Sequence, residues 1–426
     1  MTSLHLKRAV ARGQLCALLL ALTSAALPAD ELSFAQSQRL ALAQSSRLVA
    51  QDAAIAAARE LAVAAGERPD PTLSLGIDNL PVNTADRFSL SRDFMTMRRV
   101  GLMQEFTRAD KRQLRRERQE GEALLADAGK TLAETEILRA SGKAWLESYY
   151  LQQMLALVGE QVQQARQQLI AGEGAYRGGR NTQADVLTAR AEVLSLEDQL
   201  TDVQRQLRVA NMALARWVGA EPASRMLAGQ PDIDRIHFDV AELESHLSRH
   251  PDLLMLARRV DVAETEAKLA EADKRSDWSV ELSYAQRGPE FSNMMSLGVS
   301  TPLQWDQGRR QSRELAARQA QLTQAKAERD DMFRGHVAEV RARVDAWQTG
   351  RQRLQRSREQ RLPLAQARVQ AVLASYRGGK AGLADVLAAR RSALDLKLQT
   401  VQLEMQTAIE WVELNFLLPE SAGSTT

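Results

Sequence analysis

An internal repeat constrains the fold of this chain more than any other feature of its sequence. The segment Tyr176–Arg190 (YRGGRNTQADVLTAR) recurs as Tyr376–Arg390 (YRGGKAGLADVLAAR), with ten of fifteen positions identical. The same order of patterns surrounds each copy: an Ala-rich helix, a short alternating segment, a long helix that leads to the motif, and a second helix after it. Because each copy is one structural unit, the repeat sets the architecture of the whole chain.

The repeat divides the chain into predicted parts. We expect a first repeat over 30–230, whose opening helix lies near 33–66. A second repeat is expected over 231–420, with its opening helix near 239–273. The last residues, 421–426, are predicted to form a flexible tail.

The N-terminal residues have the pattern of a secretory signal peptide. Three basic residues in the first dozen precede an apolar run, Leu15–Leu22, and small residues follow up to Ala29. A charged start, a short apolar stretch and small residues at the cleavage point are typical of such a leader. We therefore expect 1–29 to be removed, with cleavage between Ala26 and Ala29, and the mature chain to leave the cytoplasm. An uncleaved membrane anchor is the alternative.

Composition excludes several classes of protein. The formal net charge is +2, and removal of a leader with three basic and no acidic residues leaves +2 − 3 = −1. This balance argues against nucleic-acid binding, which needs a basic excess. The single cysteine, Cys16, lies in the leader, so the mature chain has no disulfide or cysteine nucleophile. No HExxH, GxSxG, phosphate-binding or dinucleotide motif occurs, so we predict neither an enzyme nor a cofactor.

One helix is predicted to be far longer than a compact domain needs. No proline occurs between Pro81 and Pro222, and the residues from Ala109 to Tyr176 are mostly strong helix formers. At about 1.5 Å per residue such a helix reaches roughly 100 Å. An elongated helical assembly is therefore expected.

The helix after the first motif carries a heptad pattern. Apolar residues recur every seven positions in two series, one formed by Val186, Val193, Leu200, Leu207 and Leu214, the other by Ala189, Leu196, Val203, Ala210 and Trp217. Such a pattern predicts a coiled-coil seam against a partner helix. A core helix of an ordinary bundle is the alternative.

Four short segments alternate polar and apolar residues, which is typical of strands with one wet and one dry face. They are Thr72–Ile77, Arg98–Phe106, Trp278–Tyr284 and Asn293–Thr301. Each repeat is therefore expected to hold one β-hairpin, at about 72–106 and about 278–303. Because even small outer-membrane barrels use about 8 strands, several copies of the chain would have to share one barrel.

The repeated motifs predict two helix–turn–helix tips. The residues that can end each incoming helix in a left-handed conformation are Gly178, Gly179, Gly378 and Gly379. Thr182 and Asp185 then have the spacing of a capping box for the next helix. Two interpretations of Asp185 and Asp385 stay open: capping favoured by the helix dipole, or polar bonds that hold the end of a tunnel shut.

Residues near the hairpins indicate a membrane interface. Trp278 and Trp305 bracket the second hairpin, as an aromatic girdle would. Two basic clusters follow the hairpins and either form solvated helix faces or contact phospholipid head groups. Their members are Lys111, Arg112, Arg115, Arg116, Arg309, Arg310 and Arg313.

One histidine pair has metal-ligand spacing. His246 and His250 are four residues apart, which could place two imidazoles on one helix face. Pro251 predicts, however, that the helix starts there, so the two side chains would not share a regular turn. We favour an incidental pair and predict no metal site.

These motifs together resemble the TolC family of outer-membrane efflux ducts. The signal-peptide pattern, the two repeats and the paired YxxG…DVLxA motifs carry the resemblance over essentially the whole mature chain. The segment Val299–Arg310 at a strand-to-helix junction is also similar to the family's pattern. The resemblance implies a mainly α fold with a small β part. In it, three protomers each give four strands to one shared β-barrel and their helices to a coiled-coil tunnel in the periplasm.

The resemblance also implies a gate at the tips. Tyr376 and Asp185 match the family's gate-forming tyrosine and aspartate, and a phenol–carboxylate bond is worth roughly 1.5–3 kcal/mol. The other predicted gate residues are Tyr176, Arg180, Lys380 and Asp385. The chain departs from the family at Ala388 and Ala381, where some members have a second aspartate and an arginine. Any ionic latch is therefore predicted to be rearranged.

Short motifs near the first hairpin are similar to the heavy-metal cation efflux branch of that family. They are Asp78–Val82 and the segment Arg98–Phe106 leading into Lys111-Arg112. The implied function is the exit duct of a tripartite efflux system. Its expected partners are two further copies of the chain, outer-membrane lipid, a periplasmic adaptor protein and an inner-membrane resistance–nodulation–division antiporter.

Two alternatives to metal efflux stay open. Within the same family, the chain could be a drug-efflux or type I secretion duct. From another class, it could be a periplasmic coiled-coil scaffold, although a scaffold would have no use for four alternating segments.

Overall fold

The computed structural model describes residues 31–417 except 180–181, 240–244, 246 and 248–249. The predicted signal peptide and C-terminal tail, together with Arg180 and His246, therefore lie outside the described residues. In chain order the elements are β1 (Glu31–Ser33), α1 (Phe34–Ala43), α2 (Ser46–Gly66), β2 (Thr72–Asp78), β3 (Met97–Phe106), α3 (Ala109–Arg177), α4 (Gln183–Val218), α5 (Ala220–Ala223), β4 (Met226–Ala228), α7 (Pro251–Ala272), β5 (Trp278–Gln286), β6 (Met294–Ser300), α8 (Gln311–Arg356), η2 (Ser357–Arg361), α9 (Leu362–Arg377) and α10 (Leu383–Asn415).

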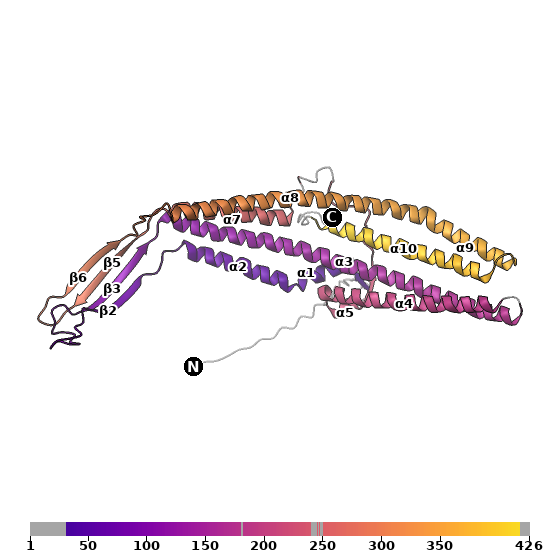
Figure 1. Cartoon of the computed structure of the whole chain (residues 1–426), viewed down its shortest axis with the longest axis horizontal. Coiled ribbons are helices and arrows are strands. Elements are labelled where there is room, and N and C mark those ends of the chain that lie inside the picture. Colours follow the sequence, from indigo (N-terminus) through magenta and orange to yellow (C-terminus); the bar gives the residue numbers. More distant parts are fainter. Residues whose placement is uncertain (1–30, 180–181, 240–244, 246, 248–249, 418–426) are drawn as a thin grey trace, which may run out of the picture.

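The molecule is a long rod with a sheet at one end and two helical hairpins at the other (Figure 1). The proline-free stretch forms α3, a single helix of 69 residues. On the opposite side α8, η2 and α9 follow one another, and η2 is a π-helical turn just before Pro363. A proline cannot donate to the preceding turn, and a π-bulge is one way to absorb that loss. None of the described helices has an apolar stretch long enough to cross a bilayer.

The two hairpins form one antiparallel sheet with the strand order β2-β3-β5-β6. Strands β3 and β5 come from different repeats and pair over nine positions, from Arg98 opposite Gln286 to Phe106 opposite Trp278. The four alternating segments are thus strands, as predicted. The outer strands β2 and β6 each have one edge without a strand partner in the described chain.

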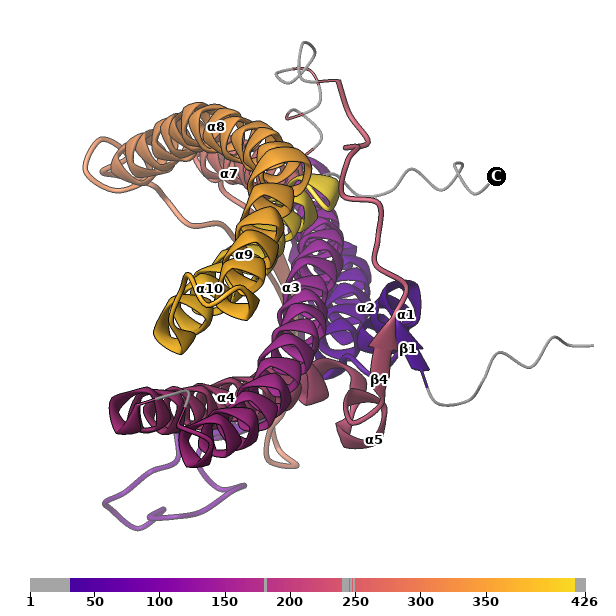
Figure 2. The ribbon, with the colours of Figure 1, turned by 90° about the vertical axis from the view of Figure 1, so that its right-hand side faces the viewer.

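The heptad pattern of α4 packs against α3. Val193, Leu196, Val203 and Ala210 are buried in one cluster with α3 residues that include Val158. Leu200 and Leu207 pack against the same cluster and are partly buried. The prediction that this pattern marks a seam with a partner helix is confirmed, and the partner is the preceding helix of the same tip hairpin. In Figure 2, which looks at the tip end, α3–α4 and α9–α10 are two adjacent hairpins.

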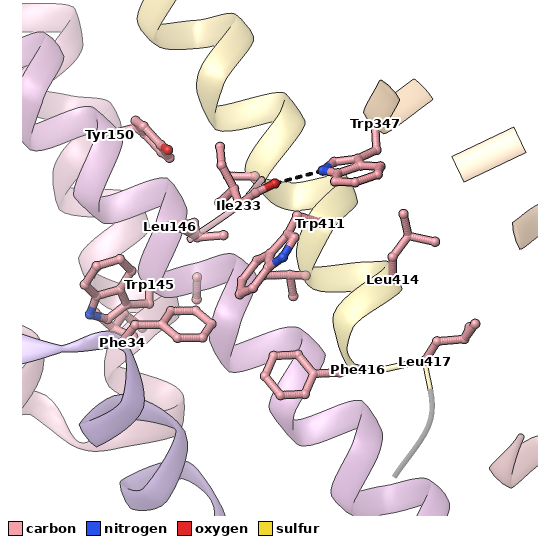
Figure 3. Packing of buried hydrophobic residues seen from close by; sticks show 14 of the residues in the cluster. Phe34, Trp145, Leu146, Tyr150, Ile233, Trp347, Trp411, Leu414, Phe416 and Leu417 are labelled. Carbon is pink, nitrogen blue, oxygen red and sulfur yellow. Dashed lines mark hydrogen bonds between the residues drawn. The ribbon is translucent and has the colours of Figure 1, made fainter. Parts of the chain in front are cut away.

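A second apolar cluster lies in the middle of the rod (Figure 3). Three tryptophans of this region donate their indole N–H to backbone carbonyls of segments outside the long helices. The pairs are Trp145 with Leu32 at 3.0 Å, Trp347 with Ile233 at 3.0 Å and Trp411 with Arg235 at 2.6 Å. These bonds fix the short parallel pair β1–β4 and the segment after it on the flank of the helices.

The two predicted opening helices are observed with different bounds in the described chain. The first is divided into α1 and α2, because Ser45 caps α2 by accepting a hydrogen bond from the Leu48 N–H at 3.4 Å. The helix α7 covers Pro251–Ala272 of the second predicted opening helix, with His250 as its N-cap, and most of the predicted part before residue 250 lies outside the described residues. A proline at the first helical position needs no N–H partner, so the chain starts a helix there readily. The division of the chain at residue 231 stays a prediction.

Candidate functional site

One face of the sheet is apolar across all four strands. Residues opposite each other in antiparallel strands lie on the same face. The register therefore produces two adjacent apolar rows, Leu73–Leu102–Leu282–Leu297 and Leu75–Val100–Tyr284–Met295. All eight side chains are between 48% and 73% exposed. A continuous exposed apolar surface of this kind marks contact with a membrane or another protein.

The opposite face of the same sheet is small and polar. Its central row reads Ser74, Gly101, Ser283 and Ser296. Beside that row, the Arg99 guanidinium lies 2.9 Å from the Asp78 carboxylate and 3.1 Å from that of Glu281. A sheet that is apolar on one face and polar on the other has the pattern of a membrane barrel with lipid outside and a polar lumen inside.

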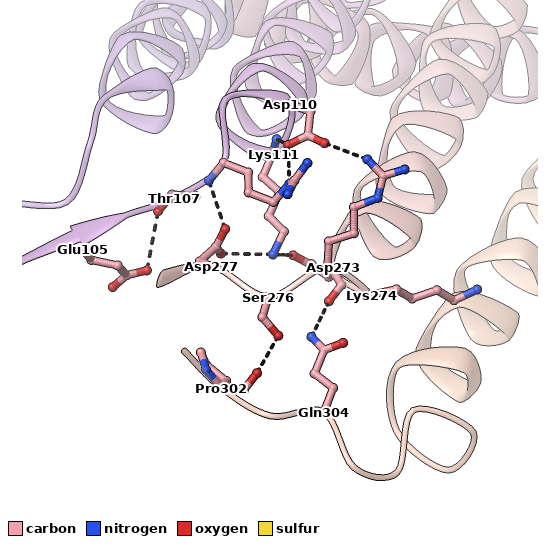
Figure 4. Close-up of polar contacts among 12 residues, drawn as sticks. Glu105, Thr107, Asp110, Lys111, Asp273, Lys274, Ser276, Asp277, Pro302 and Gln304 are labelled. Atoms are coloured by element: carbon pink, nitrogen blue, oxygen red, sulfur yellow. Dashed lines mark hydrogen bonds and ion pairs between the residues drawn. The ribbon is translucent and has the colours of Figure 1, made fainter. Parts of the chain in front are cut away.

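A buried ion pair holds the junction between strands and helices (Figure 4). The Lys111 Nζ, in the first turn of α3, lies 3.0 Å from Asp277 Oδ2 and 3.4 Å from Asp273 Oδ1. The Lys111 side chain is only 4% exposed. The other oxygen of Asp277 accepts a hydrogen bond from the Arg108 N–H at 2.9 Å, at the positive end of the α3 dipole. Asp277 thus neutralises Lys111 and caps α3.

The connection from β6 to α8 is hydrogen-bonded to the segment between α7 and β5, next to the Lys111 ion pair. The Ser276 hydroxyl donates to the Pro302 carbonyl at 2.6 Å, and the Gln304 side chain donates to the Asp273 carbonyl at 2.9 Å. The turns from β3 to α3, from α7 to β5 and from β6 to α8 are therefore joined by polar bonds. This arrangement fixes the direction in which the sheet leaves the helices.

The structure corrects one interpretation of the basic clusters. Lys111 does not face outward toward head groups, because its ammonium group is enclosed by two carboxylates. The Arg309 side chain is 88% exposed, which fits either a solvated helix face or contact with phospholipid head groups. Trp278 stacks on Phe106 with ring centroids 4.4 Å apart, and Trp305 is 88% exposed. Trp278 is the first residue of β5 and Trp305 follows β6, and their place in a membrane girdle stays a prediction.

Left-handed glycines turn the chain at both tips. Gly179 and Gly379 each have a φ of 71°, a conformation that favours glycine. At the second tip the Gly379 N–H donates to the Tyr376 carbonyl and the Lys380 N–H to that of Ser375. These two bonds are those of a Schellman motif. Gly178 and Gly378 are the C-caps before the left-handed residues and keep negative φ.

Asp185 and Asp385 begin the outgoing helices. The Asp185 Oδ2 accepts hydrogen bonds from the Thr182 hydroxyl at 2.7 Å and the Thr182 N–H at 2.9 Å. These two bonds hold the pKa of the exposed Asp185 carboxyl below its ordinary value. At the other tip the Asp385 Oδ2 accepts from the Gly382 N–H at 2.9 Å. The predicted capping is confirmed at Asp185.

The predicted gate tyrosine lies in an apolar contact between the two tips. Half-buried Tyr376 packs against a small cluster in which Ala189 of α4 meets Leu383 and Leu387 of α10. Among the described residues, no hydrogen bond joins Tyr376 to Asp185 within one protomer. Tyr176 is 46% exposed and the Lys380 side chain is also exposed. A latch formed by these residues, within one protomer or between two protomers, stays a prediction.

The sequence analysis did not predict the polar contacts between and within the two tip hairpins. The Arg391 guanidinium on α10 lies 3.4 Å from the Glu192 carboxylate on α4 and 3.4 Å from the Ser195 hydroxyl. Within the first hairpin, the Arg190 guanidinium lies 3.2 Å from the carboxylate of Glu173. Arg190 stands inside the repeated motif, but the sequence gives no clue to its partner on the preceding helix.

These features define a class of protein: an elongated helical rod that ends in a small sheet with one apolar and one polar face. The Outer membrane efflux protein family model matches residues 38–220 and 243–419. The chain belongs to this family. No curated protein sequence matches it. The predicted family and the mainly helical fold class with a small β part are confirmed.

Solved structures share the fold at low sequence identity. CusC, whose structures concern transmembrane channel formation, is 17% identical, with a TM-score of 0.77 over 90% of this chain and 92% of that one. The outer membrane protein VceC from Vibrio cholerae is 20% identical, with a TM-score of 0.73 over 90% and 95%. The outer membrane channel CmeC of Campylobacter jejuni is 12% identical, with a TM-score of 0.75 over 91% and 86%.

Proposed function

We propose that this protein is the outer-membrane exit duct of a tripartite efflux system and that it exports heavy-metal cations. The apolar face of the four-stranded sheet supports the outer-membrane placement most directly. Two complete rows of exposed apolar side chains cross all four strands, and lipid is the environment that accommodates such a surface. The helical part then extends into the periplasm.

Three copies of the chain form the duct. Four strands are too few to close a barrel, and β2 and β6 each leave one edge unpaired in the described chain. Pairing β6 of one copy with β2 of the next removes these edges, which would otherwise template aggregation. The polar rows that contain Ser74 and Arg99 then face a shared lumen.

The duct is passive and has no enzymatic activity. Its energy comes from an inner-membrane resistance–nodulation–division antiporter, and a periplasmic adaptor protein connects the two. The tips that contain Gly179 and Gly379 are the ends opposite the sheet, so they point toward these partners (Figure 1). They are also the place where the duct opens and closes.

The metal cargo is supported by residues around the sheet. Asp78 belongs to the segment similar to the heavy-metal branch, and its carboxylate lies on the polar face. Met97 and Met294 also belong to the polar rows, opposite Asp78 and Ala285, whereas Met295 belongs to an apolar row. Thioether sulfur prefers soft ions such as Cu(I) and Ag(I), so these ions are the preferred cargo.

Deletion of the gene tests the cargo. We expect the deletion strain to become sensitive to metal salts, and a plasmid copy of the gene to restore growth. Growth is measured against copper, silver, zinc, cobalt and cadmium salts, with dyes and detergents alongside. Sensitivity to dyes and detergents alone would reject metal export. Sensitivity to zinc, cobalt and cadmium without copper or silver would reject only the preference for soft ions.

Replacement of the predicted gate residues tests the tips. In planar bilayers, Asp185→Ala and Tyr376→Ala are expected to raise single-channel conductance, because each removes one partner of a latch while Gly179 and Gly379 keep the turns. Asp185→Asn should also raise it, since the amide oxygen can still cap α4 but the charge is lost.

Thr182→Ala is the matched control for capping alone. It removes the hydroxyl of the capping box but leaves the Asp185 carboxylate, so we expect a loss of about 1 kcal/mol in stability without a change in conductance. If all these variants conduct like the wild type and only lose stability, Asp185 is a cap and not a gate residue.

A further inference from the structure

A cluster of metal-ligating side chains lies away from both the tips and the sheet. His250 is the N-cap of α7, Asp252 follows in its first turn, and His336 comes from the middle of α8. Their ligand atoms all lie within 4.8 Å of one another. We propose that these three residues bind a borderline divalent transition-metal ion, represented by Zn²⁺, which joins the start of α7 to α8.

The distances suit a tetrahedral ion. The Asp252 Oδ2 lies 3.6 Å from His250 Nδ1 and 3.5 Å from His336 Nε2. Bonds of about 2.0–2.2 Å at tetrahedral angles place ligand atoms about 3.3 Å apart. The two imidazole nitrogens lie within 4.8 Å of each other, so side-chain rotations that shorten this separation bring the three groups onto one ion, and water supplies the fourth ligand.

Unpartnered ring nitrogens point to a ligand at this place. The Nε2 of His336, a ligand atom of the proposed site, is buried and makes no hydrogen bond in the described chain, and it lies 3.5 Å from the Asp252 carboxylate. The second ring nitrogen of His250, Nε2, is also buried without a hydrogen-bond partner there. His250 as a whole is 1% exposed. Its Nδ1 accepts only a long bond of 3.3 Å from the Asp252 N–H. A buried polar group is normally hydrogen-bonded, so two neighbouring imidazoles without full partners are unusual.

The two imidazole rings are neighbours, with centroids 4.5 Å apart. A metal ion binds the neutral form of imidazole through a free lone pair.

The ligand set selects the class of ion. Two imidazoles and one carboxylate suit Zn²⁺ and its neighbours in the first transition row, whereas soft monovalent ions prefer sulfur ligands. The ion would stabilise the protein rather than travel through it, so this site is independent of the exported cargo.

Zn²⁺ binding to the purified protein tests the proposal. Untagged protein in detergent is stripped with a chelator and titrated with Zn²⁺ in competition with a chromophoric chelator. We expect about one Zn²⁺ per chain, and His336→Gln and Asp252→Asn should each weaken binding by at least about 100-fold, since even loss of a ligand's supporting partner costs 10–100-fold. His237→Gln is the matched control, because His237 contacts Asn415 instead.

A second measurement does not depend on affinity. Co²⁺ should give the visible absorption of a tetrahedral site in the wild type and in His237→Gln, but not in His336→Gln. Zn²⁺ should raise the melting temperature of the first two proteins only. Absence of stoichiometric binding, or equal affinity in wild type, His336→Gln and Asp252→Asn, overturns the proposal. Because no transport is measured, a failure of the metal-export proposal leaves this result unaffected.

Discussion

Replacing Asp277 with Ala is expected to lower the free energy of unfolding by about 3 kcal/mol. The Lys111 ammonium is almost fully enclosed, and removal of one partner from a buried pair costs about 3–5 kcal/mol. Asp273 remains at 3.4 Å, which keeps the loss at the low end of that range. The variant also loses the acceptor for the Arg108 N–H. Chemical unfolding in detergent, followed by circular dichroism, measures the effect.

Two matched variants separate the buried charge from other causes. The double variant Lys111→Met with Asp277→Asn removes both charges but keeps an acceptor for Arg108, so its stability should lie within about 1 kcal/mol of the wild type. Glu264→Ala breaks an exposed pair with Lys268 and should cost less than about 1 kcal/mol. A double variant that is as unstable as Asp277→Ala would contradict the buried-charge explanation.

The sequence predicted the parts of this fold that depend on local pattern. The long helix α3 follows from a proline-free run of helix formers, and the four strands follow from alternation. The seam of α4 follows from its heptads, because each residue's burial depends on its angular position on one helix. The left-handed Gly179 and Gly379 follow from glycine's freedom at positive φ.

The interactions that the sequence did not predict join residues far apart in the chain. Lys111 belongs to a run of basic residues that looks like a solvated face, yet its two partners lie more than 160 positions later. The sequence places His250 four residues after His246, which lies outside the described residues, and it gives no sign of His336 on α8, whose ring centroid lies 4.5 Å from that of His250. Helical periodicity predicts which side of a helix is buried. It does not predict how far one helix is shifted along its neighbour, and that shift decides which side chains meet.

The same limit applies to the tips. The capping of α4 by Thr182 and Asp185 was predicted because both residues lie within one turn. The contact between Arg391 and Glu192 was not, because it depends on how α10 is placed against α4. Any change that shifts one hairpin along the other would break this pair, while the local caps would survive.

Replacing Trp145 with Ala is expected to lower the free energy of unfolding by about 3–5 kcal/mol, the range for a large buried aromatic residue. The side chain is fully buried, its ring meets Phe34 edge-on at 5.5 Å, and its N–H donates to the Leu32 carbonyl at 3.0 Å. The variant therefore loses the packing of α3 and also the bond that holds β1 on the rod.

Trp145→Phe separates these two contributions. It keeps much of the ring packing but leaves the Leu32 carbonyl without its donor, so we expect a smaller loss of about 1–3 kcal/mol. Trp305→Ala is the control, because Trp305 is 88% exposed, and its stability should change by no more than about 0.5 kcal/mol in detergent. The midpoints of chemical unfolding compare the three variants. If Trp145→Ala lowered the free energy of unfolding by less than about 1 kcal/mol, the apolar cluster in the middle of the rod would not be what holds β1 against the helices.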